Sequence, residues 1–171
     1  MRNGKFIIIY VVLLIAQIAL SGLLDFTQLF TPALLPAMIL CLPLGTGTPV
    51  TLLIAFVSGF VIDFFSGGVL GLTCTAILPV ALLKDIFLKI CFDNETYSRM
   101  NDLSVKKLGL GRILICALMM TALFLLIYVW IDGAGTRPFI FNFGRFFIST
   151  ITNVLLSIVV VDLLLAQNER R

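Results

Sequence analysis

Apolar residues run along this chain in long blocks separated by short polar segments. An apolar helix of about 20 residues is long enough to cross the hydrocarbon core of a bilayer. The pattern therefore predicts about six transmembrane helices, at residues 6–24, 32–44, 50–65, 69–92, 112–131 and 139–166. One long polar stretch, residues 93–111, interrupts the pattern and is predicted to be a loop.

The second block differs from the others in length and in its prolines. It runs from Pro32 to Leu44 and contains Pro36 and Pro43. Proline removes a backbone donor, and a block this short suits a buried or re-entrant segment as well as a short crossing. Both interpretations remain open from the pattern alone.

Composition supports a membrane location. Of the 171 residues, 60% are apolar and 12% are charged, and the mean hydropathy is +1.14. Average soluble chains carry about 25% charged residues. The composition therefore excludes a soluble enzyme, a nucleic-acid-binding protein and a disordered chain. We expect an all-α integral membrane protein, with residues 1–171 forming one compact transmembrane domain.

The basic residues predict the orientation, because lysine and arginine are enriched in cytoplasmic loops. With six crossings, both termini and the 93–111 loop share one side. Arg137 is the base on the opposite side, and Arg145 lies within the sixth helix nearby. The first side carries nine bases, namely Arg2, Lys5, Lys89, Arg99, Lys106, Lys107, Arg112, Arg170 and Arg171. Both termini are therefore expected in the cytoplasm, and crossing by Pro32–Leu44 is favoured because it keeps these bases together.

Ionisable residues inside the predicted helices are candidates for pairing or function, because a charge in hydrocarbon is costly. Depths estimated from a rise of about 1.5 Å per residue place Asp63 and Arg145 in the outer third and Lys84 and Asp162 toward the cytoplasm. Two intramembrane ion pairs, Asp63–Arg145 and Lys84–Asp162, are therefore expected. The favoured role of these pairs is to hold helices together, and a direct role in ligand or partner binding for Asp63 or Arg145 is the alternative.

Catalysis is not expected. The chain has no histidine, which removes the commonest general base and metal ligand. An intramembrane aspartyl hydrolase needs two carboxylates that share a proton, and Asp63 and Asp162 lie at different depths. Cys41, Cys74, Cys91 and Cys116 lie in apolar runs without CxxC spacing, so buried thiols are expected rather than a metal site or a disulfide. No cofactor is implied.

Small residues surround Asp63. Ala55 and Gly59, and likewise Gly67 and Gly71, are spaced four residues apart, a spacing that lets helices approach closely. The run from Ala55 to Gly71 resembles the signature of the bacterial rod shape-determining protein MreD family. That signature has a glycine, an aspartate four residues later, a Ser-Gly turn and a further glycine. The matching residues are Gly59, Asp63, Ser66, Gly67 and Gly71.

The resemblance implies a non-enzymatic membrane scaffold of the cell-elongation machinery, in the bacterial inner membrane. Such a subunit guides peptidoglycan synthesis beside an MreC-like protein, MreB, RodA and a penicillin-binding transpeptidase. The matching residues would then pack helices or bind the MreC-like partner. The 93–111 region departs from the resemblance, because it is longer than the corresponding loop of the family, and its mixed charge is typical of a solvated loop.

A second function fits a similar bundle. MreD-like proteins look like the substrate-binding subunits of energy-coupling-factor vitamin transporters, and Asp63, Arg145 and Trp130 would then line a pocket near the outer face. A small-solute exporter is a third and less favoured function, because the sequence has no internal repeat.

Overall fold

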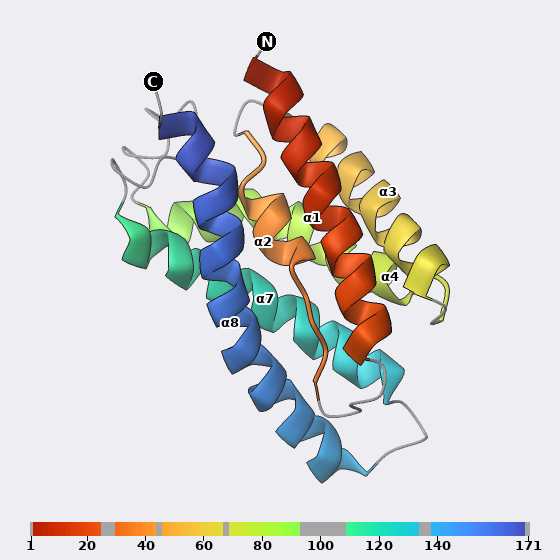
Figure 1. Cartoon of the computed structure of the whole chain (residues 1–171). Coiled ribbons are helices and arrows are strands. Elements are labelled where there is room, and N and C mark those ends of the chain that lie inside the picture. Colours follow the sequence, from red (N-terminus) through yellow and green to blue (C-terminus); the bar gives the residue numbers. More distant parts are fainter. Residues whose placement is uncertain are drawn as a thin grey trace.

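The computed structural model describes residues 2–24, 30–43, 46–66, 69–92, 109–133 and 138–169. Within these ranges the ordered elements are all helices (Figure 1). They are α1 (Arg2–Leu24), α2 (Leu35–Leu40), α3 (Thr48–Ser66), α4 (Leu72–Cys91), α7 (Leu110–Asp132) and α8 (Phe139–Glu169). The expected all-α fold is confirmed for this part of the chain.

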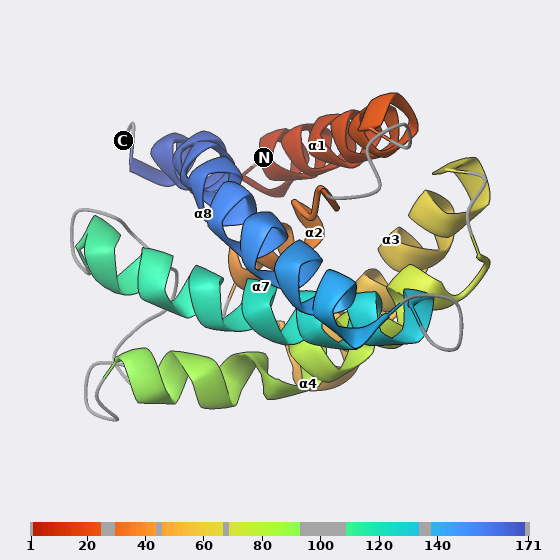
Figure 2. The same ribbon diagram turned by 90° about the horizontal axis from the view of Figure 1, so that it is seen from below.

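Five long helices form a closed ring around the short helix α2. Around the ring, α1 contacts α3, α3 contacts α4, α4 contacts α7, α7 contacts α8, and α8 returns to α1. Helix α2 contacts all five (Figures 1 and 2). The start of α1 and the end of α8 lie at the same end of the bundle (Figure 1). The centre of the protein is therefore filled by one of its own segments.

In the part of the chain that the structure describes, three helical segments are long and apolar enough to cross a membrane: Thr48–Ser66, Gly111–Asp132 and Ile140–Leu164. The apolar part of α1, Phe6–Gly22, is shorter. Helix α4 carries Lys84, Asp85 and Lys89 and is more polar. The structure thus supports a membrane protein with three long apolar helices, which is fewer than the six predicted crossings.

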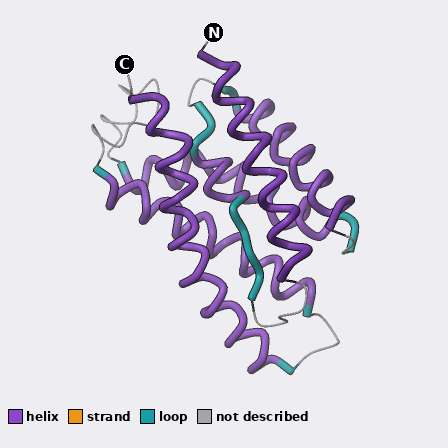
Figure 3. Tube along the Cα trace, viewed as in Figure 1, coloured by secondary structure: helices purple, strands orange, loops and turns teal. Residues whose placement is uncertain are grey.

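The prediction of a helix from Pro32 to Leu44 is wrong in its extent. Helix α2 has six residues and rises only about 9 Å. The chain before it, Phe30–Leu34, is not helical and runs through the bundle interior between α1 and α8 (Figures 1 and 3). Proline explains the late start, because Pro32 has no backbone donor and Pro36 occupies the first turn, where none is needed.

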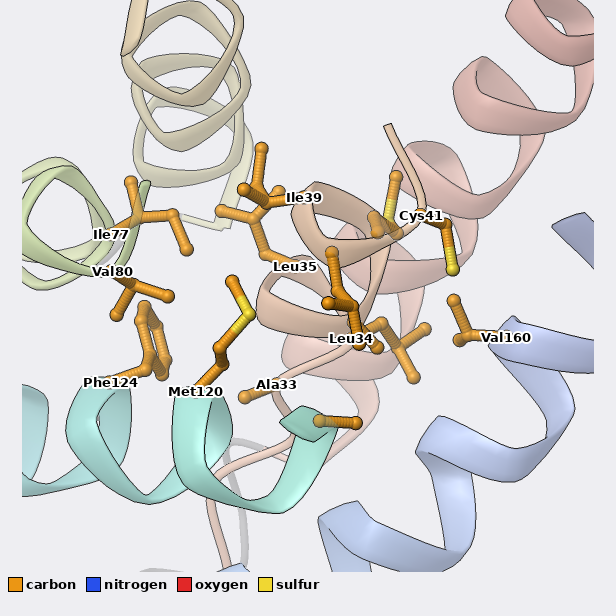
Figure 4. Packing of buried hydrophobic residues seen from close by; sticks show 14 of the residues in the cluster. Ala33, Leu34, Leu35, Ile39, Cys41, Ile77, Val80, Met120, Phe124 and Val160 are labelled. Atoms are coloured by element: carbon orange, nitrogen blue, oxygen red, sulfur yellow. The ribbon is translucent and has the colours of Figure 1, made fainter. Parts of the chain in front are cut away.

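Residues Thr31–Leu42, which we call the central segment, are all buried. Leu35 and Ile39 of this segment face Ile77 and Val80 of α4 and Met120 and Phe124 of α7, and Leu34 faces Val160 of α8 (Figure 4). By contrast, large apolar side chains on the outer surface of the ring are half-exposed or more, as at Phe64 (62%) and Ile151 (66%). The hydrophobic core is therefore centred on this segment, and the outer surface suits lipid.

The bounds of the long helices differ from the sequence prediction by a few residues, as at the start of α4. The block 69–92 was expected to be helical throughout, but α4 begins at Leu72. Gly71 has a φ of 91°, a left-handed conformation that ends the turn before α4 and favours glycine. Most of the predicted loop, residues 93–108, lies outside the described residues.

The packing of α2 predicts a contrast between two leucines. Leu35→Ala leaves a cavity at the centre of the bundle and is expected to lower the free energy of unfolding by about 2–5 kcal/mol. Leu155→Ala changes a side chain that is 62% exposed on α8, and the expected loss is below about 1 kcal/mol. Thermal unfolding in detergent, followed by protein fluorescence, measures both. Equal losses would contradict the central position of α2.

Candidate functional site

The first part of the central segment, Thr31–Leu34, carries backbone amides and carbonyls through the bundle interior before helix α2 begins. In an extended chain, the donors and acceptors of successive residues point to opposite sides. Two carboxamide side chains, one on each side, pair with these groups. Gln17 comes from α1 and Asn153 from α8, and the two are 4% and 0% exposed.

Asn153 pairs with the side of the segment that faces α8. Its Nδ2 donates to the carbonyl of Thr31 at 2.7 Å, and its Oδ1 accepts from the backbone amide of Ala33 at 2.8 Å. The hydroxyl of Ser149, one turn away, accepts from the amide of Thr31 at 3.1 Å. Asn153 therefore replaces the peptide group that a neighbouring β-strand would supply.

Gln17 pairs in the same way on the side that faces α1. Its Nε2 donates to the carbonyl of Pro32 at 2.8 Å, and its Oε1 accepts from the amide of Leu34 at 2.8 Å. The alternation between α8 and α1 follows the alternation of an extended chain. At the other end of the segment, Lys84 Nζ of α4 donates to the carbonyl of Leu42 at 2.9 Å.

The sequence analysis missed Gln17, Ser149 and Asn153. For Ser149 and Asn153, the sequence did contain an indication: polar residues repeat every three or four positions along the otherwise apolar α8. These residues are Asn142, Arg145, Ser149, Asn153 and Ser157, and all are buried. Such a stripe marks the face of a membrane helix that turns toward protein.

The predicted ion pair between Asp63 and Arg145 does not form. Arg145 is paired with Asp132 at the end of α7, and its Nε donates to the hydroxyl of Thr31 at 3.1 Å. The depth estimate was insufficient, because it does not report which helices are neighbours. Helix α8 lies against α7, and the two antiparallel helices bring Asp132 to Arg145.

The predicted pair between Lys84 and Asp162 does not form either. Lys84 is 3% exposed and points to the central segment. Asp162 is exposed on α8, on the surface turned away from the buried Val160 and Val161. A carbonyl at the end of a short helix therefore takes the place of the expected carboxylate partner of Lys84.

Asp63 instead caps α4 from the neighbouring helix. Its carboxylate accepts from the amide of Gly71 at 3.0 Å and from that of Thr73 at 3.1 Å, with a longer contact of 3.4 Å to Cys74. The first amides of a helix lack partners within it, and glycine at the N-cap offers no side chain. A carboxylate there also interacts favourably with the helix dipole.

Gly59 lies at a close approach of α3 and α4. A Cβ placed on Gly59 would lie 3.1 Å from the Cα of Cys74 and 3.2 Å from its amide nitrogen. Gly59 and Asp63 are both buried, and Ser66 is half-buried at the end of α3. Gly67 lies outside the described residues. The residues that carry the family resemblance therefore join α3 to α4 within one chain.

The cysteines and acidic residues form no metal site in the described part of the chain. No group of three or more of the metal-ligating residue types is close enough to hold an ion there. All four cysteines are free thiols. Burial is confirmed for Cys41, Cys74 and Cys116, and Cys91 is half-buried. Trp130 of α7, predicted to line a pocket, is half-buried and already has an interaction partner.

A double-mutant cycle distinguishes the observed arginine pair from the expected one. Combining Arg145→Gln with Asp132→Asn is expected to show a coupling energy of about 0.5–3 kcal/mol, because the two charges are in contact. Combining Arg145→Gln with Asp63→Asn is expected to show none within error. Unfolding free energies in detergent give both values. Coupling confined to the Asp63 cycle would contradict the observed pairing.

Two glycine substitutions test the contact between α3 and α4. Gly59→Ala forces Cβ against the backbone of Cys74, and the expected loss of stability is about 1–3 kcal/mol. Gly144→Ala on α8 is the control, because its Cβ would have no neighbour within 4 Å. The control should be neutral or stabilising by up to about 1 kcal/mol, since alanine favours helix. Unchanged thermal stability of the Gly59 variant would contradict the close approach.

Comparisons with known proteins give no assignment. The chain matches no family model, no curated protein and no solved structure. The function is therefore proposed from the geometry of the central segment and of the contact between α3 and α4. We call this contact, in which Gly59 and Asp63 meet Gly71, Thr73 and Cys74, the α3–α4 junction.

Proposed function

We propose that this chain is a multi-spanning, non-enzymatic membrane protein that works by binding other membrane proteins. The observation that carries this proposal is the occupied centre of the bundle. The central segment fills the interior of the ring, and the polar side chains that reach it hydrogen-bond to its backbone. Recognition would then use the outer surface.

Within this proposal the chain crosses the membrane six times, with the central segment as the second crossing. Both ends of the described chain lie at the same end of the bundle, which six crossings require (Figure 1). Non-helical backbone at membrane depth is tolerated when it is buried in protein, as Thr31–Leu34 is. The nine bases on one side would place both termini in the cytoplasm of a bacterial cell.

The resemblance of the Gly59–Gly71 region to the MreD family directs the proposal to the cell-elongation machinery. The chain would be a scaffold subunit of the rod-shape complex in the inner membrane. Its proposed partners are an MreC-like protein, with MreB, RodA and a penicillin-binding transpeptidase in the wider complex. Because Gly59 and Asp63 pack inside the chain, we propose that they shape the partner-binding surface indirectly by fixing α3 against α4.

The alternative, a vitamin-binding transport subunit, would need polar groups that are free to meet a ligand near the outer face. Asp63 and Arg145 were its candidate ligand residues. Asp63 is bonded to α4, and Arg145 to Asp132 and Thr31. Their engagement with the chain itself favours the scaffold.

Depletion of the protein in its native cell tests the two functions. A scaffold of elongation predicts cell rounding and mislocalised wall synthesis, whereas a transport subunit predicts a vitamin requirement that added vitamin relieves. Rescue should fail with Gly59→Leu, which separates α3 from α4, and should succeed with Gly144→Leu, a control open to lipid. Both variants must be present in the membrane fraction. Normal shape and wall synthesis after depletion would contradict the proposal.

A further inference from the structure

The backbone partners of the central segment come from opposite ends of the sequence. Gln17 precedes the segment and is available as soon as the segment is made. The partners on the other side belong to α8, which follows the other described helices along the chain. The bonds from Ser149 and Asn153 to Thr31 and Ala33 join residues separated by 118 to 122 positions.

This separation has a consequence in a membrane. Backbone amides and carbonyls in hydrocarbon must be paired, because no water is available to them. Before α8 is present, the amide and carbonyl of Thr31 and the amide of Ala33 lack the partners seen in the structure. Pro32 has no amide proton to contribute to an alternative helical turn at that position.

We infer that the central segment docks last, and that it stays in contact with water until α8 has taken its place in the bundle. This inference rests on the proposed membrane location of the chain. It makes Asn153 the residue that completes docking, since its one side chain satisfies two backbone groups. Docking of the central segment would then be the step that completes the core of the bundle.

The part of the α3–α4 contact that Asp63 makes should form earlier, because its hydrogen bonds are local. Asp63 bonds to amides that lie only 8 to 11 residues further along the chain. Contacts between residues close in sequence form faster than contacts between distant ones. Each region also contains a native cysteine, Cys41 in the central segment and Cys74 at the junction, exposed 4% and 5% respectively.

These two cysteines allow the order of docking to be measured in the full chain. Two variants keep either Cys41 or Cys74, with the other three cysteines replaced by alanine. The chains are pulse-labelled during synthesis into membranes, and a membrane-permeant maleimide is added at increasing times. Maleimide needs a hydrated thiolate, so protection reports burial. In completed chains, Cys74 should already be protected, while labelling of Cys41 should persist and then be lost.

Asn153→Leu tests whether α8 drives docking. Cys41 should remain labelled at the end of the chase, while Cys74 remains protected and shows that this part of α4 is still out of water. Thr152→Val is the matched control, because the Thr152 hydroxyl bonds to Ile148 of its own helix at 2.9 Å. Its Cys41 should be protected as in the unmodified protein. If Asn153→Leu also exposes Cys74, Ser149→Ala, which removes only the partner of the Thr31 amide, should delay protection of Cys41.

Two outcomes would overturn the inference: protection of Cys41 as early as Cys74, or normal protection of Cys41 in both the Asn153 and the Ser149 variants. Failure of the membrane location is a separate result. Alkaline extraction of the same samples detects it, because a chain that is not integrated leaves the membrane fraction whatever the order of cysteine protection.

Discussion

The structure depends on one constraint, that every backbone polar group inside the bundle needs a hydrogen-bond partner. The ring helices meet it with their own hydrogen bonds. The non-helical part of the central segment, Thr31–Leu34, cannot, because Pro32 lacks an amide proton and α2 begins only at Leu35. Side chains of α1, α4 and α8 supply the missing partners through Gln17, Lys84 and Asn153. This requirement fixes which helices surround the segment and which of their faces turn inward.

The same constraint accounts for the positions of the charges. The buried Asp63, Lys84 and Arg145 lie within helices, but each bonds to a group at the end of another helix or in the non-helical stretch before α2. Asp63 accepts hydrogen bonds from amides at the start of α4, and Lys84 donates to a carbonyl just after α2. Arg145 pairs with Asp132 at the end of α7 and donates to the Thr31 hydroxyl. Charge inside this protein therefore satisfies local backbone and side-chain groups at breaks in the helices. The ion pair that forms, Arg145–Asp132, joins the neighbouring helices α7 and α8, whereas the pairs expected from equal depth, Asp63–Arg145 and Lys84–Asp162, do not form.

A bundle built in this way has consequences for function. The interior polar groups that the sequence offered as ligand contacts are bound to the chain itself, and the centre of the ring is filled. What distinguishes one part of the outer surface from another is the set of exposed apolar side chains, such as the stacked Phe56, Phe60 and Phe64 of α3. This distribution is the basis of the proposed role in binding other membrane proteins, in which Gly59 and Asp63 act by fixing α3 against α4.

The sequence by itself determined the all-α fold, the membrane character, the positions of the five long helices and the burial of three of the four cysteines. These properties follow from apolar runs and helical rise, which are local. Only the tertiary structure decided that an extended stretch, Phe30–Leu34, leads into the short helix α2, and that Asp63 faces α4 and Arg145 faces Asp132. Those outcomes depend on which helices are neighbours. Gln17 and Asn153 are far apart along the chain, yet they bond to opposite sides of the same short stretch of backbone. A local sequence pattern cannot specify this arrangement, because it depends on how distant helices pack.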